Sequence, residues 1–148
     1  MSAIGIEAWT NLLRSHARLM RELDEELQER HAVSLGDFDV FAQLDLAPDG
    51  CLRMCDLADA VVLSPSGLSR RVDRLERAGL VERRRAAADA RSVEARLSAD
   101  GKRLFRRLRK THLTGVEEHF GGRFSERELE RLRDLLARLT AAPAEPGR

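Results

Sequence analysis

The sequence predicts a mainly α-helical protein with one small β-hairpin. Of the 148 residues, 43% are hydrophobic and 34% are charged, while only 4% are aromatic and tyrosine is absent. This composition favours helices over a β-sandwich. Apolar residues recur at the three- and four-residue spacing of helices over most of the chain, and only residues 80–97 alternate as paired strands do. The length suits one domain with a real core.

Two helices are predicted in the first third of the chain. Residues 6–30 read as one long amphipathic helix, whose apolar stripe needs a partner to cover it. Ser34 can cap a second helix over 35–46, with Asp37 in its first turn. The sequence APDG at 47–50 then ends that helix in a turn.

A helix-turn-helix is predicted next. A short helix covers residues 54–61, and Ser64 is placed to cap a second one over 65–78. Pro65 stands at the first helical position, where a missing N–H costs nothing, and Gly79 can end the helix in the left-handed conformation. Two helices joined by three or four residues are typical of the helix-turn-helix motif.

The remainder predicts a hairpin and two closing helices. Residues 80–97 contain two alternating segments around a short polar connection, which indicates a wing-like β-hairpin. Ser98 then caps a helix that ends before Gly121. Ser125 and Glu128 form an S-x-x-E capping box for the last helix.

Charge is distributed unevenly along the chain. The net charge is −7 over residues 1–63, +8 over 64–109 and zero over 110–148. Residues 63–91 alone contain eight arginines and no lysine. This cationic middle third indicates a nucleic acid as a partner.

The predicted helix over 65–78 has a polar face suited to a DNA groove. Its apolar stripe places Arg70 on the opposite side, where it can reach guanine O6 and N7. The alternative is a solvated face on which Asp73 and Arg77, four residues apart, form a weak ion pair. The DNA-contacting residues that we predict on this helix and in the hairpin are Ser64, Ser66, Ser69, Arg70, Arg74 and Arg84.

Three segments give the chain a specific resemblance. They are VDRLERAGLV at 72–81, DARSV at 89–93 and LSADG at 97–101. With the order of the predicted elements, they make nearly the whole chain resemble the MarR (multiple antibiotic resistance regulator) family of winged helix-turn-helix transcription factors. The resemblance implies that the second helix of the motif enters the major groove and that Arg91 enters the neighbouring minor groove. It also implies that Asp89 shapes the hairpin tip and orients that arginine.

The resemblance further implies an organisation and a mode of action. A single domain over 1–148 would contain a winged helix-turn-helix lobe (35–97), dimerisation helices (6–30 and 98–140) and a flexible tail (141–148). The homodimer would bind a pseudo-palindromic double-stranded site, with its two recognition helices about 10 bp apart. It would act more often as a repressor, relieved by a small-molecule effector of unknown identity that changes the helix spacing.

The effector pocket that the resemblance implies lies between the dimer helices and the DNA-binding lobe. Aromatic residues at helical spacing are more often part of a core, and that alternative stays open. The residues predicted to line the pocket are Trp9, Leu12, Leu13, His16, Phe38 and Phe41.

Cys51 and Cys55 leave a second hypothesis open. If the helix starts early, they lie four residues apart on one face and can serve a thiol- or metal-responsive regulator of the same fold. Alternatively they are small apolar side chains near a helix start, and their spacing matches no usual zinc ribbon. A third hypothesis is a winged-helix module that binds proteins and no DNA.

Other functional classes lack sequence support. The chain has no P-loop, HExxH or GxSxG motif, so we expect no enzyme, no cofactor and no metal site among its four scattered histidines. No run approaches the ~18 apolar residues of a membrane span, and the N-terminus lacks a signal pattern. We therefore expect a cytoplasmic protein with reduced thiols.

Overall fold

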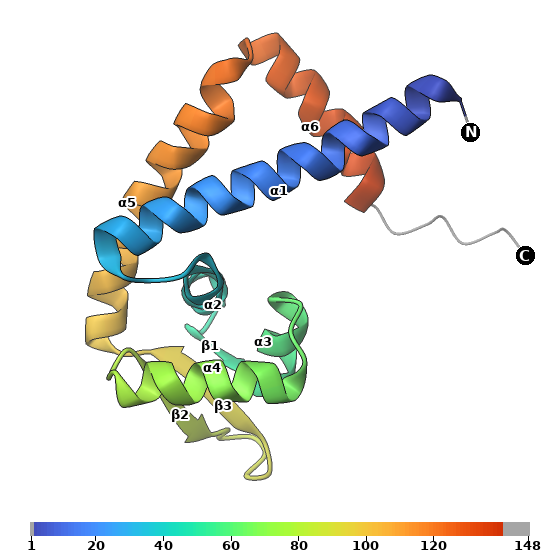
Figure 1. Cartoon of the computed structure of the whole chain (residues 1–148). Coiled ribbons are helices and arrows are strands. Elements are labelled where there is room, and N and C mark those ends of the chain that lie inside the picture. Colours follow the sequence, from blue (N-terminus) through green and yellow to red (C-terminus); the bar gives the residue numbers. More distant parts are fainter. Residues whose placement is uncertain (1, 141–148) are drawn as a thin grey trace, which may run out of the picture.

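The computed structural model describes residues 2–140, so the predicted tail over 141–148 lies outside the described residues. The described chain is mainly helical, with one small sheet, as predicted (Figure 1). In chain order its elements are α1 (Ala3–His31), α2 (Leu35–Leu46), β1 (Cys51–Arg53), α3 (Met54–Ala60), α4 (Pro65–Arg77), β2 (Val81–Arg85), β3 (Val93–Leu97), α5 (Ala99–His119), the 3-10 turn η1 (Gly121–Arg123) and α6 (Glu126–Thr140).

The elements divide into a frame of long helices and a smaller lobe. Figure 1 shows α1, α5 and α6 forming the frame, with α2, α3, α4 and the sheet on one side of it. Helix α5 belongs to both parts, because it starts at the sheet and packs along α1 further on. No helix among the described residues is long and apolar enough to cross a membrane.

The sheet has three antiparallel strands in the order β1-β3-β2. The predicted hairpin is confirmed, with Val81 opposite Leu97 at its base and Arg85 opposite Val93 towards its tip. Strand β1 was not predicted. It pairs with the other side of β3 over only three residues, which is too short a run for alternation to show.

Serine caps start three of the helices as predicted. The hydroxyl oxygens of Ser34, Ser64 and Ser98 each accept a hydrogen bond from the backbone N–H three residues on, over 3.0–3.1 Å. Gly79 follows α4 with φ of 72°, the left-handed conformation expected there. Helix α1 starts three residues earlier than predicted, because Ser2 caps it.

The core lies in the smaller lobe, around α2. Phe41 of α2 has no exposed surface and is among the largest fully buried side chains. Every neighbouring element contributes to the same cluster, which makes α2 the central packing element. The main buried members are Leu27, Phe38, Phe41, Leu44, Leu57, Leu68, Val72, Leu75, Val81, Ala95, Leu97, Phe105 and Leu108.

The start of α5 is fixed against the end of α4. The Ser98 hydroxyl donates a hydrogen bond of 2.6 Å to the Gly79 carbonyl, and the Ser98 N–H donates one of 3.0 Å to the Leu80 carbonyl. A Cβ atom on Gly101 would collide with that same Leu80 carbonyl, so only glycine allows this close approach. The LSADG segment therefore joins sheet, α4 and α5 into one packed unit.

Candidate nucleic-acid interface

The exposed side of α4 begins with small hydroxyl side chains. The Ser64 hydroxyl oxygen accepts a hydrogen bond of 3.1 Å from the Gly67 N–H and lies 3.4 Å from the Ser66 hydroxyl. Ser66 and Arg70 are exposed, whereas Ser69 is half-buried. Arg70 has no ion pair or side-chain hydrogen bond with a described residue. The first two turns of α4 therefore leave room for a binding partner to approach the helix closely, beside the available guanidinium of Arg70.

Asp37 of α2 clamps two arginines of α4. Arg74 binds it in bidentate fashion, with its two Nη atoms 2.9 and 2.7 Å from the carboxylate oxygens. Arg71 Nη1 donates to Asp37 Oδ1 over 2.8 Å and to the Ser34 hydroxyl over 3.3 Å. The Asp37 side chain is only 5% exposed. A phosphate contact at Arg74 thus stays a prediction, and it would have to use the N–H groups that Asp37 leaves over.

The Asp37 clamp sets the protonation of the carboxyl group. Burial raises the pKa of Asp37, but the hydrogen bonds and charges of Arg74 and Arg71 outweigh burial and lower the pKa below its ordinary value of 3.8. The carboxylate is therefore ionised throughout the neutral range. Because its charge is paired and hydrogen-bonded, it can stay in the interior.

Arg83 ties the wing, the β2–β3 hairpin over 81–97, to α4. Its Nε donates to Glu76 Oε2 over 3.0 Å, its backbone N–H donates to Glu76 Oε1 over 3.2 Å, and its guanidinium also binds Asp73. The alternative ion pair between Asp73 and Arg77 is therefore wrong. Sequence reasoning missed Arg83, although the strand period places it on the same face as buried Val81, which turns towards α4.

The tip of the wing is organised around Asp89. Its Oδ1 accepts a hydrogen bond of 3.0 Å from the Arg91 N–H, and its carbonyl accepts one of 3.0 Å from the Ser92 N–H. The Arg91 side chain is exposed, and no ion pair joins it to a described residue. These contacts would hold the backbone of Arg91 while leaving its guanidinium available.

Arg84 is engaged within the sheet. It faces Glu94 on the neighbouring strand, with 3.5 Å between Arg84 Nε and Glu94 Oε2. Its Nη2 also lies 3.6 Å from the Cys51 sulfur. Half of the Arg84 side chain remains exposed. Its DNA contact therefore stays a prediction.

The two cysteines do not share a helix face. Cys51 lies on β1, whereas α3 starts at Met54 and carries Cys55 in its first turn. The early helix start that a shared face would require does not occur, because the chain pairs with β3 before it turns into the helix. Both thiols are free. A thiol-responsive role stays a prediction without the common helical face that motivated it.

The residues of the predicted effector pocket occupy two different environments. Phe38 and Phe41 belong to the core, as the alternative interpretation held, while Trp9 is 56% exposed on the N-terminal half of α1. Leu12, Leu13 and His16 are exposed on the same helix. The predicted pocket is thus not assembled within one chain, and it stays a prediction that a second chain would have to complete.

His119 of α5 contacts two glutamates of α1. His119 Nε2 is 2.6 Å from Glu26 Oε1, and its Nδ1 is 3.3 Å from Glu22 Oε2. Glu118 lies close enough for Glu26, Glu118 and His119 to offer ligand atoms within 4.8 Å of one another. Within this group, His119 already contacts Glu26, and the expectation of no metal site stays a prediction.

Comparison with known proteins gives consistent similarities. Residues 33–92 match the sequence model of the MarR family. The HTH-type transcriptional regulator PecS of Dickeya dadantii is 33% identical over 121 residues, which cover 80% of this chain and 71% of PecS. An uncharacterized HTH-type transcriptional regulator of Bacillus subtilis, YfiV, is 32% identical over 94 residues, 55% of this chain and 59% of YfiV.

Solved structures share the whole arrangement. AbsC, a MarR family transcriptional regulator from Streptomyces coelicolor, superposes with a TM-score of 0.87 and 27% identity, over 95% of this chain and 94% of AbsC. Sco3205, a MarR family regulator from the same organism solved in complex with DNA, has a TM-score of 0.87 and 25% identity, over 100% of this chain and 94% of Sco3205.

We predict that Asp37→Asn loosens α4 and lowers stability by about 1–3 kcal/mol, because a neutral amide cannot balance two guanidinium groups. The folded pKa of Asp37 is lowered, so its contribution is fully present above about pH 5 and is lost as the pH falls through the folded pKa. Urea denaturation at fixed protein concentration should show a constant difference from wild type between about pH 5 and 8, which narrows below about pH 4.

Asp45→Asn is the matched control, because Asp45 is an exposed carboxylate on the same helix. It should leave the free energy of unfolding within about 0.5 kcal/mol of wild type. Equal effects of the two substitutions, or a difference that does not depend on pH, would contradict the clamp.

Proposed function

The chain belongs to the MarR family of transcriptional regulators, and we propose that it acts by binding double-stranded DNA through α4 and the wing. Two features of the lobe support this proposal. One is the supply of arginines that form no ion pair within residues 2–140, and the other is the pair of elements that present them. The similarity to Sco3205, which was solved with DNA, extends over the whole chain and adds support.

The division of the eight arginines over 63–91 carries the proposal. Arg71, Arg74, Arg83 and Arg84 bind acidic side chains of the lobe. The other four have no ion pair with a described residue, and all four are exposed. Since two come from α4 and two from the hairpin, they suit two separate grooves of one duplex. These four are Arg70, Arg77, Arg85 and Arg91.

We assign different tasks to the two groups of available arginines. Arg70 follows the small residues of the first turn of α4, so it is placed for the major groove, where arginine pairs with guanine O6 and N7. Arg91 lies at the wing tip, where a narrow minor groove attracts arginine. To Arg77 and Arg85 we assign phosphate contacts.

We infer a homodimer from the apolar surface that the frame leaves uncovered among the described residues. Helix α6 buries none of its residues in this chain, and the N-terminal half of α1 exposes several large apolar side chains. Such a surface indicates an interface, and a second copy would give the two-fold symmetry of a pseudo-palindromic site. The apolar residues that we assign to it are Ile4, Ile6, Trp9, Leu12, Leu13, Leu135, Leu136 and Leu139.

We further assign the regulator as a cytoplasmic repressor that a small-molecule effector relieves. Asp37 connects α2, which packs on the frame, with α4, so a ligand bound between frame and lobe would act on the DNA-facing helix. Such a ligand must bind the two helix spacings with different affinity. This role needs no catalytic residue.

DNA binding should depend steeply on salt. A dimer that makes six or more phosphate contacts should lose roughly a thousandfold in affinity between 50 and 200 mM salt, because it displaces condensed counterions. Fluorescence anisotropy on a duplex located by footprinting upstream of its own gene would measure this. A salt-independent affinity, or no footprint, would favour the protein-interaction module instead.

Substitution of the two groove arginines should have separable effects. Arg70→Ala should weaken operator binding by about 1–3 kcal/mol and relax the preference at one base pair. Arg91→Ala should weaken binding with less loss of major-groove discrimination. Binding to a panel of single-base operator variants would separate them. The control variant Arg127→Ala changes an exposed arginine of α6 and should bind the operator as wild type does.

The dimer should depend on α6. Leu135 is 48% exposed in the single chain, and Leu135→Asp should leave the protein monomeric at a concentration where wild type is dimeric, because a carboxylate would be buried unpaired. Sedimentation velocity would measure this. Leu46→Asp, at a leucine of α2 that is 76% exposed, should leave the dimer intact. A dimeric Leu135→Asp protein would contradict the assigned interface.

A further inference from the structure

A second cationic surface lies outside the lobe arginines, on the first half of α5. Its four side chains follow the spacing i, i+3, i+4 and i+7, so they share one face of the helix. That face is opposite Phe105 and Leu108, which are buried in the core. We call it the α5 cationic face and define it by Arg103, Arg106, Arg107 and Lys110.

The charge of the α5 cationic face is largely uncompensated. Residues 99–110 contain six lysines and arginines and a single acidic residue, Asp100. Asp100 pairs with Arg103, whereas Arg106, Arg107 and Lys110 form no ion pair with a described residue. Neighbouring cations at these spacings repel one another.

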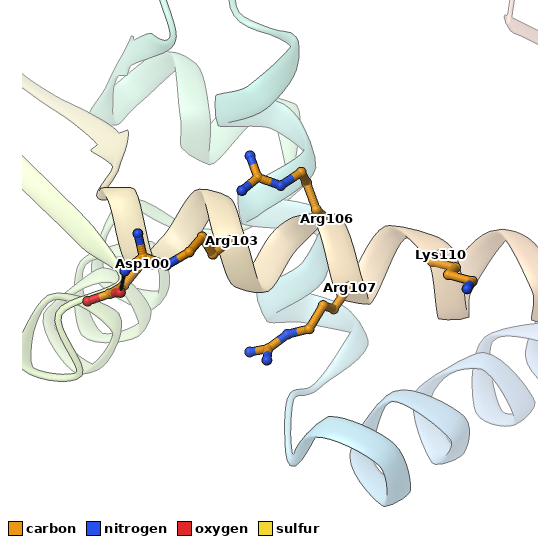
Figure 2. Close-up of a pocket in the computed structure, with 5 residues that line it drawn as sticks. All are labelled: Asp100, Arg103, Arg106, Arg107 and Lys110. Atoms are coloured by element: carbon orange, nitrogen blue, oxygen red, sulfur yellow. Dashed lines mark hydrogen bonds and ion pairs between the residues drawn. The ribbon is translucent and has the colours of Figure 1, made fainter.

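The side chains surround an open pocket of about 450 Å³. Figure 2 shows Arg106 and Arg107 directing their guanidinium groups to either side of the helix, with Asp100 beside Arg103 at one end and Lys110 at the other. All four cationic side chains are exposed. The pocket is thus lined by four cationic residues and one acidic residue, and its net positive charge suits an anion.

We propose that the α5 cationic face binds a small anion that carries two or more phosphate groups. Seven residues of helix separate Arg103 from Lys110, about 10 Å along the axis, which one phosphate group cannot span and two or three can. Arg106 and Arg107 offer planar forks that match phosphate oxygens, Lys110 adds a point charge, and Arg103 can add the N–H groups that Asp100 leaves over. A bound polyphosphate would remove the repulsion along the face. This inference does not depend on whether the chain binds DNA.

The test uses the full-length protein without DNA and inorganic tripolyphosphate as the probe, with isothermal titration calorimetry in 100 mM NaCl. Wild type should bind saturably, with about one anion per chain. The double variant Arg106→Gln/Arg107→Gln should bind about tenfold more weakly or worse, because it loses two charge-assisted contacts. A thermal melt should show that the variant is folded.

Two comparisons make the result specific. Arg127→Gln/Arg131→Gln removes the same charge from the exposed side of α6, where acidic residues alternate with the arginines, and should keep the affinity within about twofold of wild type. Citrate, a carboxylate trianion, should bind more weakly than tripolyphosphate. Equal binding of citrate, or equal losses in both double variants, would overturn the proposal.

A further arm separates a free polyphosphate from the phosphates of a DNA backbone. Both double variants are titrated with a duplex that lacks the operator. The proposal expects saturable binding of tripolyphosphate by wild type, whatever the duplex does. No binding of tripolyphosphate, together with a loss of duplex affinity only in Arg106→Gln/Arg107→Gln, would overturn it and assign the face to DNA.

Discussion

The carboxylate of Asp37 is the contact on which the placement of α4 depends. A buried charge is costly unless it is paired and hydrogen-bonded, and Asp37 meets that condition only when both Arg71 and Arg74 reach it from α4. Two residues before Asp37, the Leu35 N–H at the start of α2 donates a hydrogen bond of 2.7 Å to Asp24 of α1. Frame, α2 and α4 are therefore joined by successive polar contacts beside the apolar core.

Pairing within the protein also decides how much charge the lobe can offer to a partner. The net charge of +8 over residues 64–109 counts every arginine equally. In the folded lobe, half of the arginines over 63–91 are neutralised by acidic side chains that lie far away in the sequence or on a neighbouring element. The remaining arginines are separated in space between helix and hairpin, so the surface presents two small sources of positive charge and not one broad patch.

The predictable parts of this protein are those that local chemistry determines. Caps at Ser34, Ser64 and Ser98, the stop at Gly79 and the alternation of the hairpin need only a few neighbouring residues, and all of them are confirmed.

Strand β1 depends on a partner more than forty residues away, and a three-residue run carries no periodic signal. Ion pairs between elements are equally hard to predict. Arg83 binds Asp73 only because β2 packs on α4. The environment of Phe41 and Trp9 likewise depends on which helices meet, a property of the tertiary fold.

The close contact of Gly101 with the Leu80 carbonyl has a mechanical consequence. Because this contact and the hydrogen bond from Ser98 to the Gly79 carbonyl hold the start of α5 against the end of α4, we expect the wing and α4 to turn with α5 as the head of a lever turns with its arm. The arm is 21 residues, about 30 Å, long. A tilt of about six degrees at its far end, where Gly115 packs against Leu23 and Glu26 of α1, would carry the head through about 3 Å, roughly the rise of one base pair. We therefore expect small adjustments in how α1 and α5 cross to displace α4 and the wing by a distance comparable with the rise of one base pair.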